Sequence, residues 1–135
     1  MVISDEKLNR RLENKALSYL ARFASSEANL RQVLIRFGRR KCWPKDGDKD
    51  EEPAFLIQLN QAIDRLVIRY ARLGYVDDAA YAHARARGMR VRGTSGRHIS
   101  HYLKAKGVNG DVISQTMDDD NIGSMDAETD AARKY

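Results

Sequence analysis

The chain has 135 residues, which is enough for one domain or two small ones. Lys and Arg outnumber Asp and Glu by 24 to 19, giving a net charge of +5. No stretch has the roughly 20 apolar residues of a membrane-spanning helix or the pattern of a signal peptide, and the single cysteine, Cys42, excludes an internal disulfide. These features favour a cytoplasmic protein, and the shortage of alternating β-branched residues favours an all-α fold.

Three helices are predicted first, over residues 5–23, 26–37 and 54–73, because apolar residues recur there at spacings of three and four. Gly38 is expected to end the second helix as a left-handed cap, and Gly74 to stop the third. The side chains predicted to face inward are Leu8, Leu12, Ala16, Tyr19, Leu20 and Phe23, then Leu30, Val33, Leu34 and Phe37, then Leu56, Leu59, Ile63, Leu66, Val67, Tyr70 and Leu73.

A polar insertion, residues 43–53, separates the second and third helices and lacks the apolar surface to pack by itself. Trp43 opens this insertion, and two interpretations are open: an anchor for an interface, or a residue that pins the loop to its own core, which we favour.

Three more helices are predicted over residues 77–89, 95–106 and 109–117. Asp77 and Asp78 suit the positive N-terminal end of the first of these. Its inward side is mostly alanine with Tyr81, and the inward residues of the last are Val112, Ile113 and Met117.

The helices form two tandem three-helix units, residues 1–75 and 76–121, with the insertion inside the first. Residues 122–135 begin a third, incomplete unit, because acidic residues early and basic residues late are typical of a helix. Two acidic runs, residues 46–52 and 118–120, are expected to be solvated loops.

A repeat relates the two units, because Ser26, Leu30, Leu34 and Gly38 recur 69 residues later. Their counterparts are Ser95, Ile99, Leu103 and Gly107. Serine caps the first turn of a helix, the apolar residues share one face, and glycine closes the helix. A duplicated helical unit that carries strong positive charge points to a binding surface.

Two segments are basic and free of acids, and we expect them to contact a partner or a nucleic acid. Residues 79–110 hold Arg85, Arg87, Arg90, Arg92, Arg97, Lys104 and Lys106. Residues 28–45 hold Arg31, Arg36, Arg39, Arg40, Lys41 and Lys45. A solvated surface is the alternative for both segments, and the two interpretations are equally favoured for the second.

No catalytic or metal site is expected, and no cofactor. His98 and His101 could share a helix face, but zinc needs three or four ligands. Residues 46–57 lack the glycine and the final carboxylate of a calcium loop. Ser25, Ser26 and Ser95 have no adjacent histidine base, so capping explains them.

Taken together, these residues resemble the bacterial RecX regulatory proteins, which modulate the RecA recombinase. The resemblance is most specific at residues 73–82, Leu-Gly-Tyr-Val-Asp-Asp-Ala-Ala-Tyr-Ala, and at residues 93–108, and residues 16–34 look like the family's first unit. The chain departs from the family in its long insertion, in His98 and Tyr102 at positions often charged, and in its incomplete third unit.

The resemblance implies an elongated, curved module of helix-turn-helix-like units that lies in the groove of the RecA–DNA filament. It implies a monomeric, non-enzymatic regulator that inhibits filament extension, ATP hydrolysis and strand exchange, in homologous recombination, DNA repair and the SOS response. Single- and double-stranded DNA would bind weakly through the basic surface. The alternative is a general DNA-binding helical module without a recombinase partner.

Overall fold

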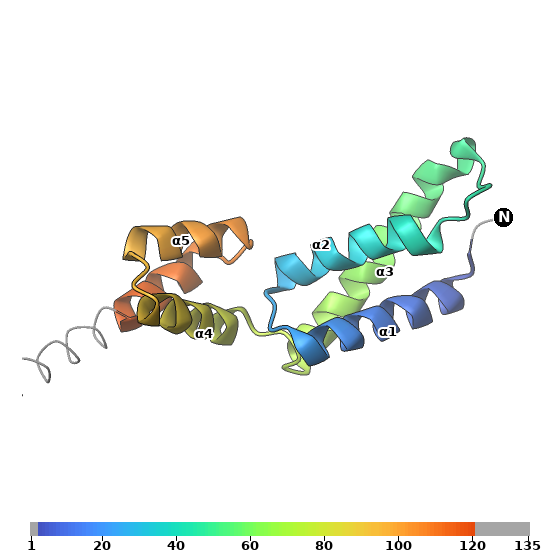
Figure 1. The fold of residues 1–135 in the computed structure, drawn as a ribbon. Coiled ribbons are helices and arrows are strands. Elements are labelled where there is room, and N and C mark those ends of the chain that lie inside the picture. The colour runs from blue at the N-terminus through green and yellow to red at the C-terminus, as the bar shows by residue number, and fades with distance from the viewer. Residues whose placement is uncertain (1–2, 121–135) are drawn as a thin grey trace, which may run out of the picture. The chain divides into compact units, whose positions relative to one another are not determined.

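Residues 3–120 are described in the computed structural model of the chain, and within them there are helices and turns but no strand. The all-α prediction is therefore confirmed. The chain divides between Val76 and Asp77 into two compact units, called unit 1 and unit 2 below (Figure 1). The third unit predicted over residues 122–135 lies outside the described residues.

Unit 1 contains three helices, α1 (Asp5–Arg22), α2 (Glu27–Phe37) and α3 (Glu52–Arg72), which pack on one another (Figure 1). A π-helical turn, Gly38–Cys42, extends α2, and a 3-10 turn, Lys49–Glu51, leads into α3. The third helix begins earlier than predicted because Pro53 lies in its first turn, where the missing N–H costs nothing.

The core of unit 1 is the predicted apolar stripe of each helix. Its fully buried side chains include Leu8 and Leu12 of α1, Leu34 of α2 and Leu59 of α3. Trp43 packs on this core with its ring centroid 5.0 Å from that of Phe55, which confirms that it pins the loop.

Two predicted inward residues are wrong, because Phe23 and Leu73 are 54% and 56% exposed. Phe23 is the C-cap of α1 and Leu73 the C-cap of α3. The helical period assigns a face, but the last residue of a helix extends past the neighbouring helices that would cover that face.

Gly38 also corrects a prediction, because its φ of −61° is ordinary right-handed helix rather than a left-handed cap. The chain continues helically through Cys42. A Cβ on Gly38 would lie 2.9 Å from Leu59 Cδ2 and closer still to Cδ1. The glycine is thus required by the close approach of α3, whereas its repeat counterpart Gly107, at φ 78°, is a true left-handed cap.

Unit 2 contains α4 (Asp78–Val91), α5 (Gly96–Ala105) and a third helix over residues 110–120 (Figure 1). Its core is small: the buried face of α4 is Tyr81, Ala82 and Ala86, as predicted, and it meets Ile99 and Leu103 of α5. Side chains of the third helix pack against this cluster.

The repeat is confirmed at the start of each repeated helix. Ser26 Oγ accepts a hydrogen bond from the Asn29 amide at 3.1 Å, and Ser95 Oγ accepts one from the His98 amide at 3.3 Å. The apolar pairs that follow are all fully buried: Leu30 with Ile99, and Leu34 with Leu103.

Candidate functional site

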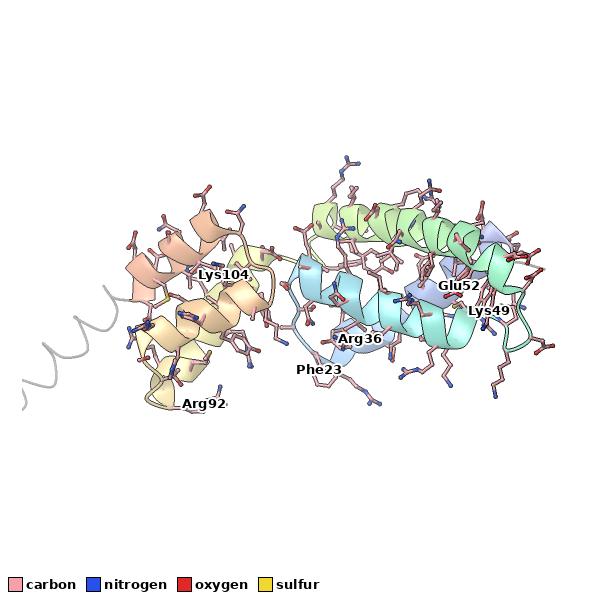
Figure 2. All side chains as sticks on the ribbon, turned by 90° about the horizontal axis from the view of Figure 1, so that it is seen from above. Phe23, Arg36, Lys49, Glu52, Arg92 and Lys104 are labelled. Atoms are coloured by element: carbon pink, nitrogen blue, oxygen red, sulfur yellow. The ribbon has the colours of Figure 1, made fainter. Side chains whose placement is uncertain are left out.

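The basic residues of unit 2 fall into two groups. The side chains of Arg87, Arg92, Arg97 and Lys104 are exposed, and none forms an ion pair within residues 3–120. Figure 2 shows Arg92 and Lys104 extending from the ribbon of this unit. Arg85, Arg90 and Lys106 are half-buried and have partners inside the unit.

Arg85 and Lys106 are held by Tyr102 of α5. Arg85 Nη2 donates to Tyr102 Oη at 2.9 Å, and its Cζ lies 5.1 Å from the ring centroid. Lys106 Nζ lies 5.6 Å from the same ring. Burial opposes ionisation of Tyr102, but hydrogen bonds from Tyr81 and Arg85 and the charges of Arg85 and Lys106 outweigh it and lower the pKa of Tyr102. This group ties α4 to α5.

Arg90 is held by the third helix. Its Nε donates to Asp120 Oδ2 at 2.5 Å, with the two side chains 32% and 12% exposed. Residues 118–120 are helical, so our prediction of a solvated loop for this acidic run is wrong. Its carboxylates neutralise part of the basic segment, so Arg90 is less available for a partner than its exposed neighbours.

His83 forms a second link to the same acidic run. Its Nδ1 lies 2.7 Å from the carbonyl oxygen of Ala79, and its Nε2 lies 2.8 Å from Asp119 Oδ2. Only a protonated imidazole can donate to both acceptors. The hydrogen bond to Asp119, followed by that to Ala79, raises the pKa of His83, and the same bond lowers the pKa of Asp119.

The turn between α4 and α5 carries the least neutralised charge of the unit. Arg92 is the C-cap of α4, and Arg97 lies in the first turn of α5, which contains no acidic residue. The N-terminal end of a helix is itself positive, because its first amides have no intrahelical partner. Each of the two guanidinium groups favours an anion, and so does the helix end beside Arg97.

Unit 1 carries the second basic cluster at the end of α2. Arg31 is paired with Asp64 of α3, so it serves the fold. Arg36 lies in the last turn of α2, and Arg39 and Arg40 lie on the π-helical turn; all three are exposed. Figure 2 shows Arg36 on this unit. As candidate contact residues, these three stay a prediction.

The described residues also bear on metal, membrane and catalytic sites. Among residues 3–120, no group of three or more His, Cys, Asp or Glu side chains could hold a metal ion. No helix in the described part of the chain is long and apolar enough to cross a membrane. Ser26 and Ser95 cap helices, and Ser25 donates to the Ser26 carbonyl at 2.9 Å, so these hydroxyls have structural partners.

The pairings of Arg85, Arg90 and His83 were missed by the sequence analysis. Each joins residues at least 17 positions apart on different helices. The acids at residues 118–120 were visible in the sequence as possible partners for the basic segment. Nothing local in the sequence indicates which arginine an acid will meet.

Comparison with known proteins gives the family. The family model for the second three-helix domain of RecX matches residues 77–117, which belong to unit 2. The regulatory protein RecX of Myxococcus xanthus (strain DK1622) is 34% identical over 122 residues, which cover 90% of this chain and 60% of that protein. The chain belongs to the RecX family.

RecX membership agrees with the observed architecture, since the family model describes a three-helix domain and the described part of unit 2, residues 77–120, has three helices. The chain spans about three fifths of the length of its curated RecX relative. No solved structure matches the chain. The matched segment contains α4, α5 and the turn between them, where the exposed cations gather.

Proposed function

We propose that this RecX family protein binds the RecA–DNA filament and inhibits its extension, its ATP hydrolysis and its strand exchange. The observation that carries the proposal is the set of exposed cations on unit 2, without carboxylate partners within residues 3–120: Arg87, Arg92, Arg97 and Lys104. They lie in or beside the segment that matches the RecX domain model. The regulatory name of the relative supports the proposed role.

The proposed mechanism is steric and electrostatic and requires no catalytic group. A nucleoprotein filament presents both carboxylates and phosphates, and guanidinium groups bind either in two-point geometry. A helical unit seated between neighbouring recombinase subunits would hinder the movements coupled to ATP hydrolysis. A unit seated at a growing end would stop extension.

Arg36, Arg39 and Arg40 of unit 1 are proposed as a second contact. Two binding surfaces on one chain raise the effective concentration of the second contact once the first has formed. Binding through both units would therefore be tighter than through either one.

The test is single-strand-dependent ATP hydrolysis by the RecA recombinase of the same organism, measured while this protein is titrated in from well below equimolar. Arg92 and Arg97 are reversed together, as Arg92→Glu and Arg97→Glu, because neither side chain has a partner among the described residues. Arg22→Glu with Arg72→Glu is the matched control, since both are exposed residues in the last turns of α1 and α3, outside the two clusters and without a partner among the described residues.

We expect the wild type and the control to inhibit and the α4–α5 variant to require at least about 100-fold more protein, because each of the two charge-assisted contacts contributes about 1.5–3 kcal/mol. Inhibition below one protein per recombinase would favour end-capping or wedging over competition for DNA. Equal inhibition by all three proteins would remove the α4–α5 turn from the binding surface.

A general DNA-binding module is the second candidate, favoured by the positive N-terminal end of α5 beside Arg97. Binding to DNA alone would weaken with salt with a log–log slope of about −0.9 for each phosphate contacted. Tight binding to the filament with weak binding to bare DNA would exclude this candidate. Equal binding to both would favour it.

A further inference from the structure

Unit 1 holds a cavity of about 330 Å³ between the start of α1 and the π-helical turn. Small-molecule sites typically have volumes of about 300–1,000 Å³, so the cavity is large enough for a compact ligand. The residues that give it chemical character are Lys7, Arg11, Lys41, Cys42 and Trp43. Its lining residues lie outside the two basic clusters of the proposed function. Lys41 lies at the edge of the cluster of unit 1.

The cavity is strongly positive. Three of its lining residues are cations, and none is acidic. Within residues 3–120, no ion pair forms at Lys7, Arg11 or Lys41. The nearby acids of the first turn of α1 are engaged elsewhere, since Asp5 accepts from Gln58 at 2.7 Å and Glu6 faces Arg10 at 3.7 Å.

Arg11 is fixed in position before any ligand arrives. Its Nη1 donates to the Lys41 carbonyl oxygen at 2.8 Å, which joins α1 to the π-helical turn 30 residues away. The guanidinium also forms a hydrogen bond with the Cys42 thiol, and the group has five donors in all. The remaining donors can serve an anion without first losing side-chain freedom.

Trp43 adds an aromatic wall to the same cavity. Trp43 is one of the lining residues, and its indole packs against Phe55 and is only partly buried. An aromatic ring is a platform on which any base can stack, whatever its identity. Cations that bind phosphate and a ring that stacks on a base are the two components of a nucleotide site.

We propose that this cavity binds a phosphate-bearing nucleotide, with Lys7, Arg11 and Lys41 on the phosphate and Trp43 against the base or sugar. The shared chemistry is one nucleotide unit, which a free mononucleotide or a single strand could supply. The site lies in unit 1, so it does not depend on the surface proposed for unit 2.

Trp43 is the single tryptophan of the chain and reports directly on the cavity. Its emission is recorded for the full chain while one of four probes is added: adenosine monophosphate, adenosine, inorganic phosphate or a dT12 oligonucleotide. Lys7→Gln removes a lining cation with no structural partner among the described residues, so it tests the site without loss of the fold. Arg22→Gln, on the same helix outside the cavity and without a partner among the described residues, is the matched control.

We expect saturable quenching by adenosine monophosphate or by dT12, no saturation with adenosine, and about 10-fold weaker binding to Lys7→Gln with Arg22→Gln unchanged. Quenching by the mononucleotide assigns a free nucleotide, and quenching by dT12 alone assigns a strand. Inorganic phosphate should compete with whichever probe binds. Absence of quenching by both nucleotides, equal binding of adenosine, no competition, or equal loss in the two variants would overturn the proposal.

Discussion

Leu34 of α2 and Leu103 of α5 occupy equivalent places in the repeat, and neither side chain has any exposed surface. Replacement of either by alanine removes the same methyl groups from a closed core. Such a change costs about 2–5 kcal/mol, the sum of lost burial and a residual cavity. The two substitutions are therefore matched in chemistry and differ only in the unit that must absorb the loss.

The two units differ in their expected free energy of unfolding. At about 0.05–0.15 kcal/mol per residue, a unit over residues 77–120 has ~2–7 kcal/mol of stability, and one over residues 3–76 has ~4–11 kcal/mol. The core of unit 2 is also poorer, because the buried face of α4 is largely alanine. We expect Leu103→Ala to unfold unit 2 near 37 °C, whereas Leu34→Ala leaves unit 1 folded.

Circular dichroism and tryptophan emission separate these outcomes, because Trp43 lies in unit 1. Leu103→Ala should lose about two fifths of the helical signal, the share of helical residues that belongs to unit 2, with unchanged Trp43 emission. A simultaneous change in Trp43 emission would refute independent unfolding of the units. Full helicity of Leu103→Ala at 37 °C would refute the low free energy of unfolding expected for unit 2.

Gly38→Ala should lower the free energy of unfolding by about 1–3 kcal/mol because the new methyl overlaps Leu59. Gly88→Ala, in the open interior of α4, should raise it by ~0.5–1 kcal/mol. Denaturant unfolding of both variants measures these changes, and equal shifts in the two would contradict the overlap with Leu59. The stabilisation from His83 is fully present below its ordinary pKa of 6.5 and is lost as pH rises through the raised value; that from Asp119 is present above 3.8 and is lost as pH falls through the lowered one. The melting temperature of unit 2 should thus be highest between those two pH limits. A His83→Gln variant whose melting temperature depends on pH as that of the wild type does would contradict this assignment. Burial raises the pKa of the Cys42 thiol from its ordinary 9.0, against the opposing hydrogen bond and charge of Arg11, so an aromatic disulfide reagent at pH 7.5 should react slowly with the folded chain and quickly in denaturant; equal rates would show that the thiol is accessible.

Much of the candidate site could be predicted from residue type alone. Segments rich in Arg and Lys and free of acids are visible in the sequence. The resemblance to RecX is most specific in and around residues 77–117, the segment that the family model matches. Which of those cations are exposed could not be predicted. Arg90 meets an acid 30 residues away, and Arg31 meets one 33 residues away, and only helix packing brings these pairs together.

The helices, their serine N-caps and most of the core follow from the local sequence, because these depend on interactions between residues three or four apart. The hydroxyl of Ser26 reaches an amide three residues on, and the apolar face follows from the helical period. Tertiary structure alone decided the rest. It left Phe23 and Leu73 uncovered at helix ends, made Gly38 a point of contact with α3, and formed an open cavity lined by Arg11 and Lys41. Local periodicity says which residues share a face, but only the packing of distant segments decides what that face meets.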